Sequence, residues 1–399
     1  MAMMTAAIDG SDAPAKPAGA LSRIADVEVL QDLTAAEPVW RTLQQPEQLS
    51  TPYQRFDLLA AWQRNVGAAA QISPFIVVAR DADGHPLLLL PLGLERAHGL
   101  RIARFLGGKH TTFNMALWQQ DFAQRATAAD LAALLDGLRG HADKADVLAL
   151  RQQPQSWNGV VNPLTLWKHQ PSVNDCPLLI IAPGASPVSL ISNSFRRRLK
   201  SKEKKLQPLA GYRYGIARSD AEIDAVLDWF FAVKPLRMAA QKLPDVFAEP
   251  GVAGFIREAC LAKLADGGRA IDIHVLQCDD EVIAIFAGVA DGQRFSMMFN
   301  TYTLSDSARY SPGLILMRNI IDHYAALGYS AIDLGIGSDD YKRLFCKSDE
   351  QVFDSFVALS ARGRLGAAAL AAATRGKRLV KHNPALMRLA QWTRGALRR

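Results

Sequence analysis

The segment Arg309–Phe345 reads RYSPGLILMRNIIDHYAALGYSAIDLGIGSDDYKRLF, and it holds the clearest structural signals of the 399-residue chain. Ser311 and Gly313 flank Pro312, which suits the first position of a helix because its missing N–H is not needed there. The apolar residues that follow recur at helical spacing as far as Gly328, a residue type typical of helix ends. A short apolar run then predicts a buried strand. A helix between strands indicates an α/β fold.

The start of this helix is a candidate anion site. Small residues let a ligand approach the backbone closely, and the free N–H groups of the first turn favour negative charge together with the helix dipole. The alternative is a plain helix start without a ligand. The residues that we assign to a bound anion are Arg309, Tyr310, Ser311, Pro312, Gly313 and Leu314.

The same order of elements is predicted twice along the chain. In the first half we expect helices within 39–70, a hairpin at 75–79 and 87–94, a strand at 114–118, a helix at 129–141 and a strand at 146–150. In the second half we expect helices at 221–231 and 255–264, strands at 271–277, 282–290 and 295–300, a helix at 313–327 and a strand at 331–334. Two copies of one α/β domain, with mixed sheets flanked by helices, explain this pattern.

The pattern predicts a division of the chain into four parts. They are a disordered leader at 1–20, a first domain at 21–175, a second domain at 176–360 and a basic, Ala-rich helical tail at 361–399. The proline-rich connection between the domains predicts an edge strand at 177–182.

The first copy lacks a glycine where the second has Gly313, and Asp130 near that helix start would repel a phosphate. We therefore expect the first copy to be a scaffold or an acceptor platform. Its segment Gly107–His110 either lines the cleft between the domains or forms a flexible loop.

Composition limits the function classes. Charged residues at 21% and hydrophobic residues at 49% are typical of globular proteins, and no apolar run reaches the ~20 residues of a membrane span. The four cysteines are widely spread, so we expect reduced thiols, a cytoplasmic location and no metal site.

The net charge of +7 is concentrated in residues 196–205 and in the tail beyond Asp354, which has no acidic residue. Such surfaces favour nucleic acid, anionic lipid or phosphate-rich ligands. The alternative is a solvated helix face with no partner. Helical spacing between residues 365 and 397 predicts basic amphipathic helices, which allow peripheral contact with an anionic membrane.

The motifs of the second copy resemble those of a known family. The run Tyr310–Gly313, the helix ending at Gly328, the sequence Asp333-Leu334-Gly335-Ile336-Gly337 and the pair Tyr341-Lys342 resemble the acetyltransferases of the CelD/BcsL type, a GNAT branch linked to cellulose biosynthesis. The basic run Phe195–Lys200 is also similar to that family. The resemblance is good over residues 194–356 and vaguer over the first 170. More distantly, the chain is similar to the FemAB peptidyltransferases, which pair two GNAT-like domains and take aminoacyl groups from tRNA.

The resemblance implies a tandem GNAT fold, with acetyl-CoA or another acyl-CoA as co-substrate. It also implies an amine or hydroxyl acceptor, such as a saccharide or a cell-envelope precursor. The helix start at residues 309–314 then becomes the CoA site, together with Lys342, which could instead contact the acceptor.

Acyl transfer needs a base for the acceptor and an acid for the departing thiolate. Asp333 and Asp339 are the candidate bases and Tyr341 is the candidate acid, although Asp333 can also be a structural cap and Tyr341 a packing residue. No Ser-His-Asp or Cys-His pattern commends a covalent intermediate, which favours direct transfer in a ternary complex.

Two other functions stay open. One is a FemAB-like transferase that uses aminoacyl-tRNA, in which the basic residues 196–205 would bind RNA. The other is a catalytically silent GNAT-like module that binds a ligand or a partner.

Overall fold

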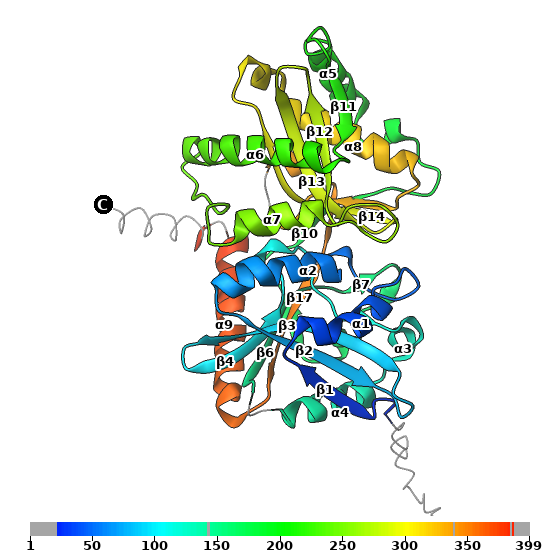
Figure 1. Ribbon diagram of the computed structural model, residues 1–399, viewed down its shortest axis with the longest axis vertical. Coiled ribbons are helices and arrows are strands. Elements are labelled where there is room, and N and C mark those ends of the chain that lie inside the picture. Colours follow the sequence, from blue (N-terminus) through cyan, green and yellow to red (C-terminus); the bar gives the residue numbers. More distant parts are fainter. Residues whose placement is uncertain (1–21, 142–143, 338–339, 384, 387–399) are drawn as a thin grey trace, which may run out of the picture.

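The computed structural model describes residues 22–141, 144–337, 340–383 and 385–386. It contains two α/β units stacked along the long axis of the molecule (Figure 1). The predicted leader at 1–20, the candidate base Asp339 and the tail from residue 387 onward lie outside the described residues.

The first unit is built on an eight-stranded sheet with the order β1-β2-β3-β4-β6-β17-β9, and β5 pairs with β3. The strands are β1 (Asp26–Leu30), β2 (Ser73–Arg80), β3 (Pro86–Ala97), β4 (Leu100–Phe105), β5 (Leu117–Trp118), β6 (Val147–Pro154), β9 (His169–Pro171) and β17 (Val352–Ala358). The helices are α1 (Leu33–Leu43), α2 (Phe56–Trp62), α3 (Gln120–Arg125), α4 (Ala128–Arg139) and α9 (Ala361–His382). A short pair, β7 (Ser156–Trp157) and β8 (Val160–Val161), stands apart from the sheet.

The second unit has a seven-stranded sheet with the order β11-β12-β13-β14-β15-β10-β16. The strands are β10 (Cys176–Ile180), β11 (Arg213–Ile216), β12 (Asp272–Gln277), β13 (Val282–Ala290), β14 (Arg294–Tyr302), β15 (Ala331–Asp333) and β16 (Ser348–Glu350). The helices are α5 (Asn193–Glu203), α6 (Asp220–Ala240), α7 (Val252–Leu261) and α8 (Pro312–Ala326).

The two units repeat one order of elements, which confirms the tandem α/β prediction. The first unit runs β1-α1-α2-β2-β3-β4-α4-β6 and the second runs β11-α6-α7-β12-β13-β14-α8-β15. In each unit the last two strands of this series are parallel, as β4 with β6 and β14 with β15, and the helix between them is the crossover connection.

Two predicted strands differ from the structure. The third strand of the first meander is β4, because the tight turn at His98 and Gly99, both at positive φ, folds β4 directly onto β3. Of the segment expected at 114–118, the structure leaves only β5 as a strand. The segment expected as an edge strand at 177–182 is β10, which lies between β15 and β16 rather than at the edge.

The end of the described chain returns to the first unit. Strand β17 pairs with β6 and β9 in the first sheet, and α9 packs on β17, β6 and β4. The sequence boundaries placed residues 352–358 in the second domain and the helix in a separate tail. Local patterning cannot reveal to which of two similar sheets a strand belongs, so this exchange needs the three-dimensional structure.

One apolar core joins the two units. Residues on alternate positions of β12 and β13, such as Ile273, Val275 and Ile285, lie in the same cluster as the core of the first unit. The other face of the second sheet packs on α8, and α5 packs on α8 in turn. Helices α2 and α7 meet where the two units join. The units therefore share a buried interface that fixes their relative position.

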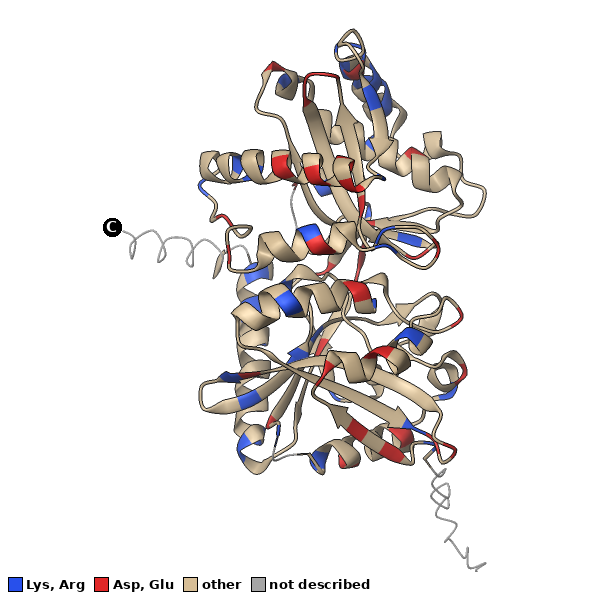
Figure 2. Ribbon diagram, viewed as in Figure 1, with Lys and Arg blue, Asp and Glu red and all other residues tan. Residues whose placement is uncertain are grey.

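Charge is distributed unevenly over this frame. Figure 2 shows Lys and Arg gathered along α5, at the end of the molecule remote from the first unit. None of the described helices is both long enough and apolar enough to cross a membrane.

Candidate active site

Strands β14 and β15 separate after a short parallel contact. Their pairing joins residues 294–296 to residues 331–333 and then stops. Beyond β15 the chain turns at Gly335 and Gly337, which have φ of 73° and 121°. The edge of β14 over residues 297–300 therefore has no strand partner on the β15 side within the described part of the chain. Within this segment the Asn300 carbonyl accepts a hydrogen bond from the Lys234 ammonium at 2.9 Å.

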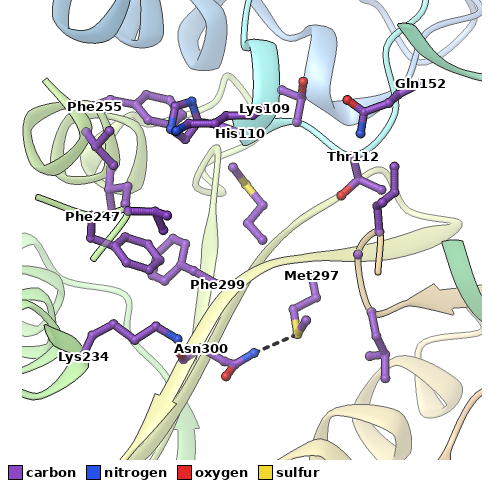
Figure 3. Close-up of a pocket in the computed structure, with 18 of the residues that line it drawn as sticks. Lys109, His110, Thr112, Gln152, Lys234, Phe247, Phe255, Met297, Phe299 and Asn300 are labelled. Atoms are coloured by element: carbon purple, nitrogen blue, oxygen red, sulfur yellow. Dashed lines mark hydrogen bonds between the residues drawn. The ribbon is translucent and has the colours of Figure 1, made fainter. Parts of the chain in front are cut away.

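A cavity of about 470 Å³ opens at this separation and is lined by both units (Figure 3). The second unit contributes residues 297–300 of β14 and residues 334–336 after β15. The first unit contributes residues 109–112 and Gln152. Phe247 and Phe255 form part of an apolar wall. We call this space the interdomain cavity.

Tyr341 and Lys342 both line the interdomain cavity. The Asn300 amide donates a hydrogen bond to the Tyr341 hydroxyl oxygen at 3.4 Å, which places this oxygen beside the open edge of β14. Lys342 is buried, and its ammonium donates to the carbonyl oxygens of Gly335 and Ile336 at 3.1 and 3.3 Å. Lys342 thus holds the turn that separates the two strands.

Asp333 lies outside the cavity lining and is fully buried. Its Oδ2 accepts hydrogen bonds from Arg294 Nε at 2.9 Å and from the Ser296 hydroxyl. Its Oδ1 accepts from the Gly335 N–H at 3.1 Å and from the Cys176 thiol at 3.6 Å. Both carboxylate oxygens are therefore engaged, so Asp333 orients the residues around the cavity.

The predicted anion site at the start of α8 contains a cation that the sequence did not assign to it. Ser311 begins the helix with φ of 58°, and no described side chain caps the first turn. Lys202 of α5 donates a hydrogen bond from its ammonium to Ser311 Oγ at 2.7 Å. A positive charge therefore lies at the start of α8, where the N–H groups of Leu314 and Ile315 donate to the Ser311 carbonyl at 3.0 and 3.2 Å. The predicted residues divide into two places, since 309–314 lie at the helix start and Tyr341 and Lys342 lie at the cavity.

Arg309 and Gly313 take lesser parts in this turn. Arg309 is exposed, and its guanidinium lies 3.8 Å from Asp306 and over the ring of Tyr310. A Cβ added to Gly313 would meet Tyr302 at 3.6 Å, an ordinary contact distance. The fold therefore accommodates a Cβ at position 313 in ordinary contact with its neighbours.

The matching helix of the first unit is filled by its own side chains. Asp130 and Thr127 cap α4 reciprocally, and Arg23 pairs with the Asp130 carboxylate at 3.3 Å. The start of α4 is therefore capped by side chains and carries a carboxylate, which disfavours a phosphate there. This contrast with α8 agrees with the expectation that donor binding belongs to the second unit.

His110 brings an imidazole to the interdomain cavity. The Trp62 indole N–H donates to His110 Nδ1 at 3.0 Å. Because the indole nitrogen can only donate, the proton of the neutral imidazole sits on Nε2. Burial and the neighbouring Lys109 lower the pKa of His110 and keep the ring neutral. His110 is therefore a hydrogen-bond donor. Of the two readings left open for Gly107–His110, the structure shows the one in which its residues line the cleft.

Comparisons with known proteins agree with this geometry. Residues 193–343 match the sequence profile of the acetyltransferase (GNAT) domain. The sequence comparison with curated proteins gives no match.

Solved structures support the fold over most of the chain. The fold is similar to the C-terminal domain of a protein assigned as a lysylphosphatidylglycerol synthetase from Agrobacterium fabrum, with 10% identity, a TM-score of 0.52 and coverage of 86% of this chain and 97% of that one. It is also similar to FemX, with 10% identity, a TM-score of 0.53 and coverage of 82% and 96%. A conserved protein of unknown function from Bacteroides thetaiotaomicron gives 10% identity, a TM-score of 0.50 and coverage of 82% and 99%. Residues 193–343 thus form a GNAT-type acyltransferase domain within a chain that repeats one α/β arrangement twice.

Proposed function

We propose that this acyltransferase takes its acyl group from an acyl-CoA, acetyl-CoA being the simplest, and passes it to an amine or hydroxyl acceptor. The observation that carries the proposal is the open edge of β14 over residues 297–300, which faces the interdomain cavity. An extended chain that bears amide groups, such as pantetheine, can add to such an edge as a further strand does. The phosphates of the same molecule fit the start of α8, where Lys202 supplies positive charge.

Tyr341 is our candidate proton donor for the departing thiolate, because its hydroxyl lies beside the open edge. Asp333 acts as a positioning residue through Arg294 and the Gly335 turn. Asp339 remains a candidate base outside the described residues. No cysteine or serine is among the described residues that line the cavity, so we favour direct transfer in a ternary complex.

The acceptor is proposed to reach the cavity from the first unit, through residues 109–112 and Gln152. The resemblance to the CelD/BcsL type favours a saccharide or a cell-envelope precursor as the acceptor. We therefore propose a role in the synthesis of cellulose or another polysaccharide.

We place the enzyme in the cytoplasm, because its four cysteines are buried free thiols. Helix α9 exposes Leu365 and Leu379 beside several cations, which favours contact with an anionic membrane surface.

Isothermal titration with acetyl-CoA and with CoA tests the donor. We expect saturable binding of both, and the absence of binding would refute the proposal. A FemAB-like use of aminoacyl-tRNA is the second candidate, because Arg197, Arg198 and Lys200 are exposed on α5. Binding of tRNA that weakens steeply with salt, without binding of CoA, would favour this second candidate.

A further inference from the structure

Strand β6 contains a bulge beside the interdomain cavity. The pairing of β6 with β17 runs from Gln153 opposite Phe353 to Leu150 opposite Ser355. Arg151 and Gln152 therefore both stand opposite Asp354, two residues against one. Such bulges redirect side chains and are frequent next to active sites.

The bulge holds Gln152 in a conformation that residues with a side chain rarely adopt. Its φ is 59°, in the left-handed region. The Gln152 N–H donates to Asp354 Oδ1 at 2.9 Å, and the Gln152 carbonyl accepts from the Asn114 N–H at 2.9 Å. The Asn114 side-chain amide donates to the Arg151 carbonyl at 3.2 Å, and the Ser172 hydroxyl also donates to Asp354. A strained residue persists only where its surroundings fix it in this way.

Gln152 stands where three hollows meet. It lines the interdomain cavity, into which Figure 3 shows its side chain pointing. It also lines two smaller hollows of about 330 and 210 Å³, and Arg151 lines both of these. We call these two the side hollows. The side hollows therefore adjoin the interdomain cavity at Gln152, which lines all three.

Arg151 is a cation without a close counter-ion. No described carboxylate lies within 4.0 Å of its guanidinium, and its buried Nε has no hydrogen-bond partner. Asp354 and Glu95 act on it only from a distance, while burial and Arg104 lower its pKa. The guanidinium lies over the ring of Phe356, with its Cζ 5.4 Å from the ring centroid. Leaving a half-buried charge without a counter-ion is costly, which suggests an anionic ligand that pairs with Arg151.

The rest of the side hollows adds to the positive charge around Arg151. Lys377 of α9 is exposed in the smaller one. Arg104 and Lys109 line the larger one, where they pair with Glu95 and Glu249. Asp354 is the acidic residue of the smaller hollow, and its Oδ1 is occupied by Gln152 and Ser172. The balance of charge favours an anion.

We infer that the side hollows bind an anionic group of the acceptor, a carboxylate or a phosphate, through Arg151, with Gln152 positioning the adjoining part of the acceptor at the interdomain cavity. The planar guanidinium matches both anions bidentately. The identity of the bound molecule as the acceptor rests on the proposed function. The anion site itself is independent of the donor.

The test is site-resolved labelling of arginines with phenylglyoxal, followed by peptide mass spectrometry, on the full-length protein with saturating CoA. Saturating CoA is included because, if it occupies the start of α8 as proposed, added phosphate reports on other sites. Inorganic phosphate and succinate are compared at equal ionic strength with chloride. We expect at least fivefold slower labelling of Arg151 with one of the two anions. The exposed Arg364 of α9 should change by less than 1.5-fold.

The two anions distinguish the two sources. Protection by phosphate indicates a phosphorylated acceptor, and protection by succinate indicates a carboxylate. Equal labelling of Arg151 with both anions and with chloride would overturn the inference. The Arg151→Gln variant should lose anion binding measured by titration, and Arg364→Gln should keep it. If CoA does not bind but phosphate still protects Arg151, the proposed donor fails while the anion site stands.

Discussion

Replacing Asp333 with Asn tests whether this carboxylate positions the site or performs chemistry. Asn keeps one oxygen for the Gly335 N–H, but it puts an amide NH₂ where Arg294 Nε and Ser296 Oγ now donate. Arg294 keeps Glu350 as a partner, but it stays buried between the rings of Phe113 and Trp157 with one donor fewer satisfied.

The magnitude follows from these contacts. A hydrogen bond to a charged group contributes about 1.5–3 kcal/mol, and a buried donor left unsatisfied costs about 1–3 kcal/mol. Together they match the ~3–5 kcal/mol lost when one partner of a buried ion pair is removed. We therefore expect the Asp333→Asn variant to lose about 3–5 kcal/mol of unfolding free energy.

Guanidinium unfolding followed by circular dichroism measures this loss. The matched control is Asp306→Asn, since Asp306 is 94% exposed and its pair with Arg309 spans 3.8 Å. The control should stay within about 0.5 kcal/mol of the wild type. The positioning role would be refuted if the Asp333→Asn variant had an unfolding free energy within about 1 kcal/mol of the wild type and yet lost more than about a hundredfold in kcat. Asp333 would then again be the candidate base.

Three further outcomes follow from the site and the core. Tyr341→Phe should lower kcat about a hundredfold, within the usual range for a lost proton donor, while KM for acetyl-CoA stays within threefold in a thiol-release assay; a loss below threefold would argue against the role. Lys202→Gln should weaken CoA binding about tenfold by titration, since it removes the cation beside Ser311, whereas Lys204→Gln, at the exposed C-cap of the same helix, should not. Burial lowers the pKa of His274 to about 3, so below pH ~6.5 the unfolded chain binds a proton that the folded chain refuses, and stability falls as pH falls. The resulting loss of unfolding free energy reaches about 2–3 kcal/mol at pH 4.5. His274→Gln should therefore make the unfolding free energy depend less on pH than in the wild type. An unchanged pH dependence would contradict the lowered pKa of His274.

Much of the fold could be predicted from the sequence because its signals are local. The helix at 313–327 begins at Pro312 and ends before Gly328, and the structure places α8 within one residue of this range. The hairpin of β2 and β3 was evident from two apolar runs around a turn. These elements depend on spacing and on turn residues, which are read from neighbours along the chain.

The site could be predicted only in part. The start of α8 was evident, but its cation Lys202 comes from a helix more than a hundred residues earlier. Arg151 and Gln152 carry no local signal, because their bulge exists only when Asp354 returns to pair with β6. Asp333 was singled out for its place after an apolar run, while its engagement by Arg294 depends on the register of β14 with β15. Pairing between distant strands is the information that one sequence does not display.

The return of β17 to the first sheet has a consequence for synthesis. Residues 155–351 separate β6 from its partner β17, so the first sheet is incomplete while the second unit is being made. At about 5–20 residues per second, a ribosome needs about 10–40 s for that stretch. During this time the edge of β6 is unpaired, and the core residues that pack against the fully buried Phe353 stay exposed on the nascent chain. The amino-terminal unit is therefore expected to complete its sheet last, against the usual order of folding during synthesis.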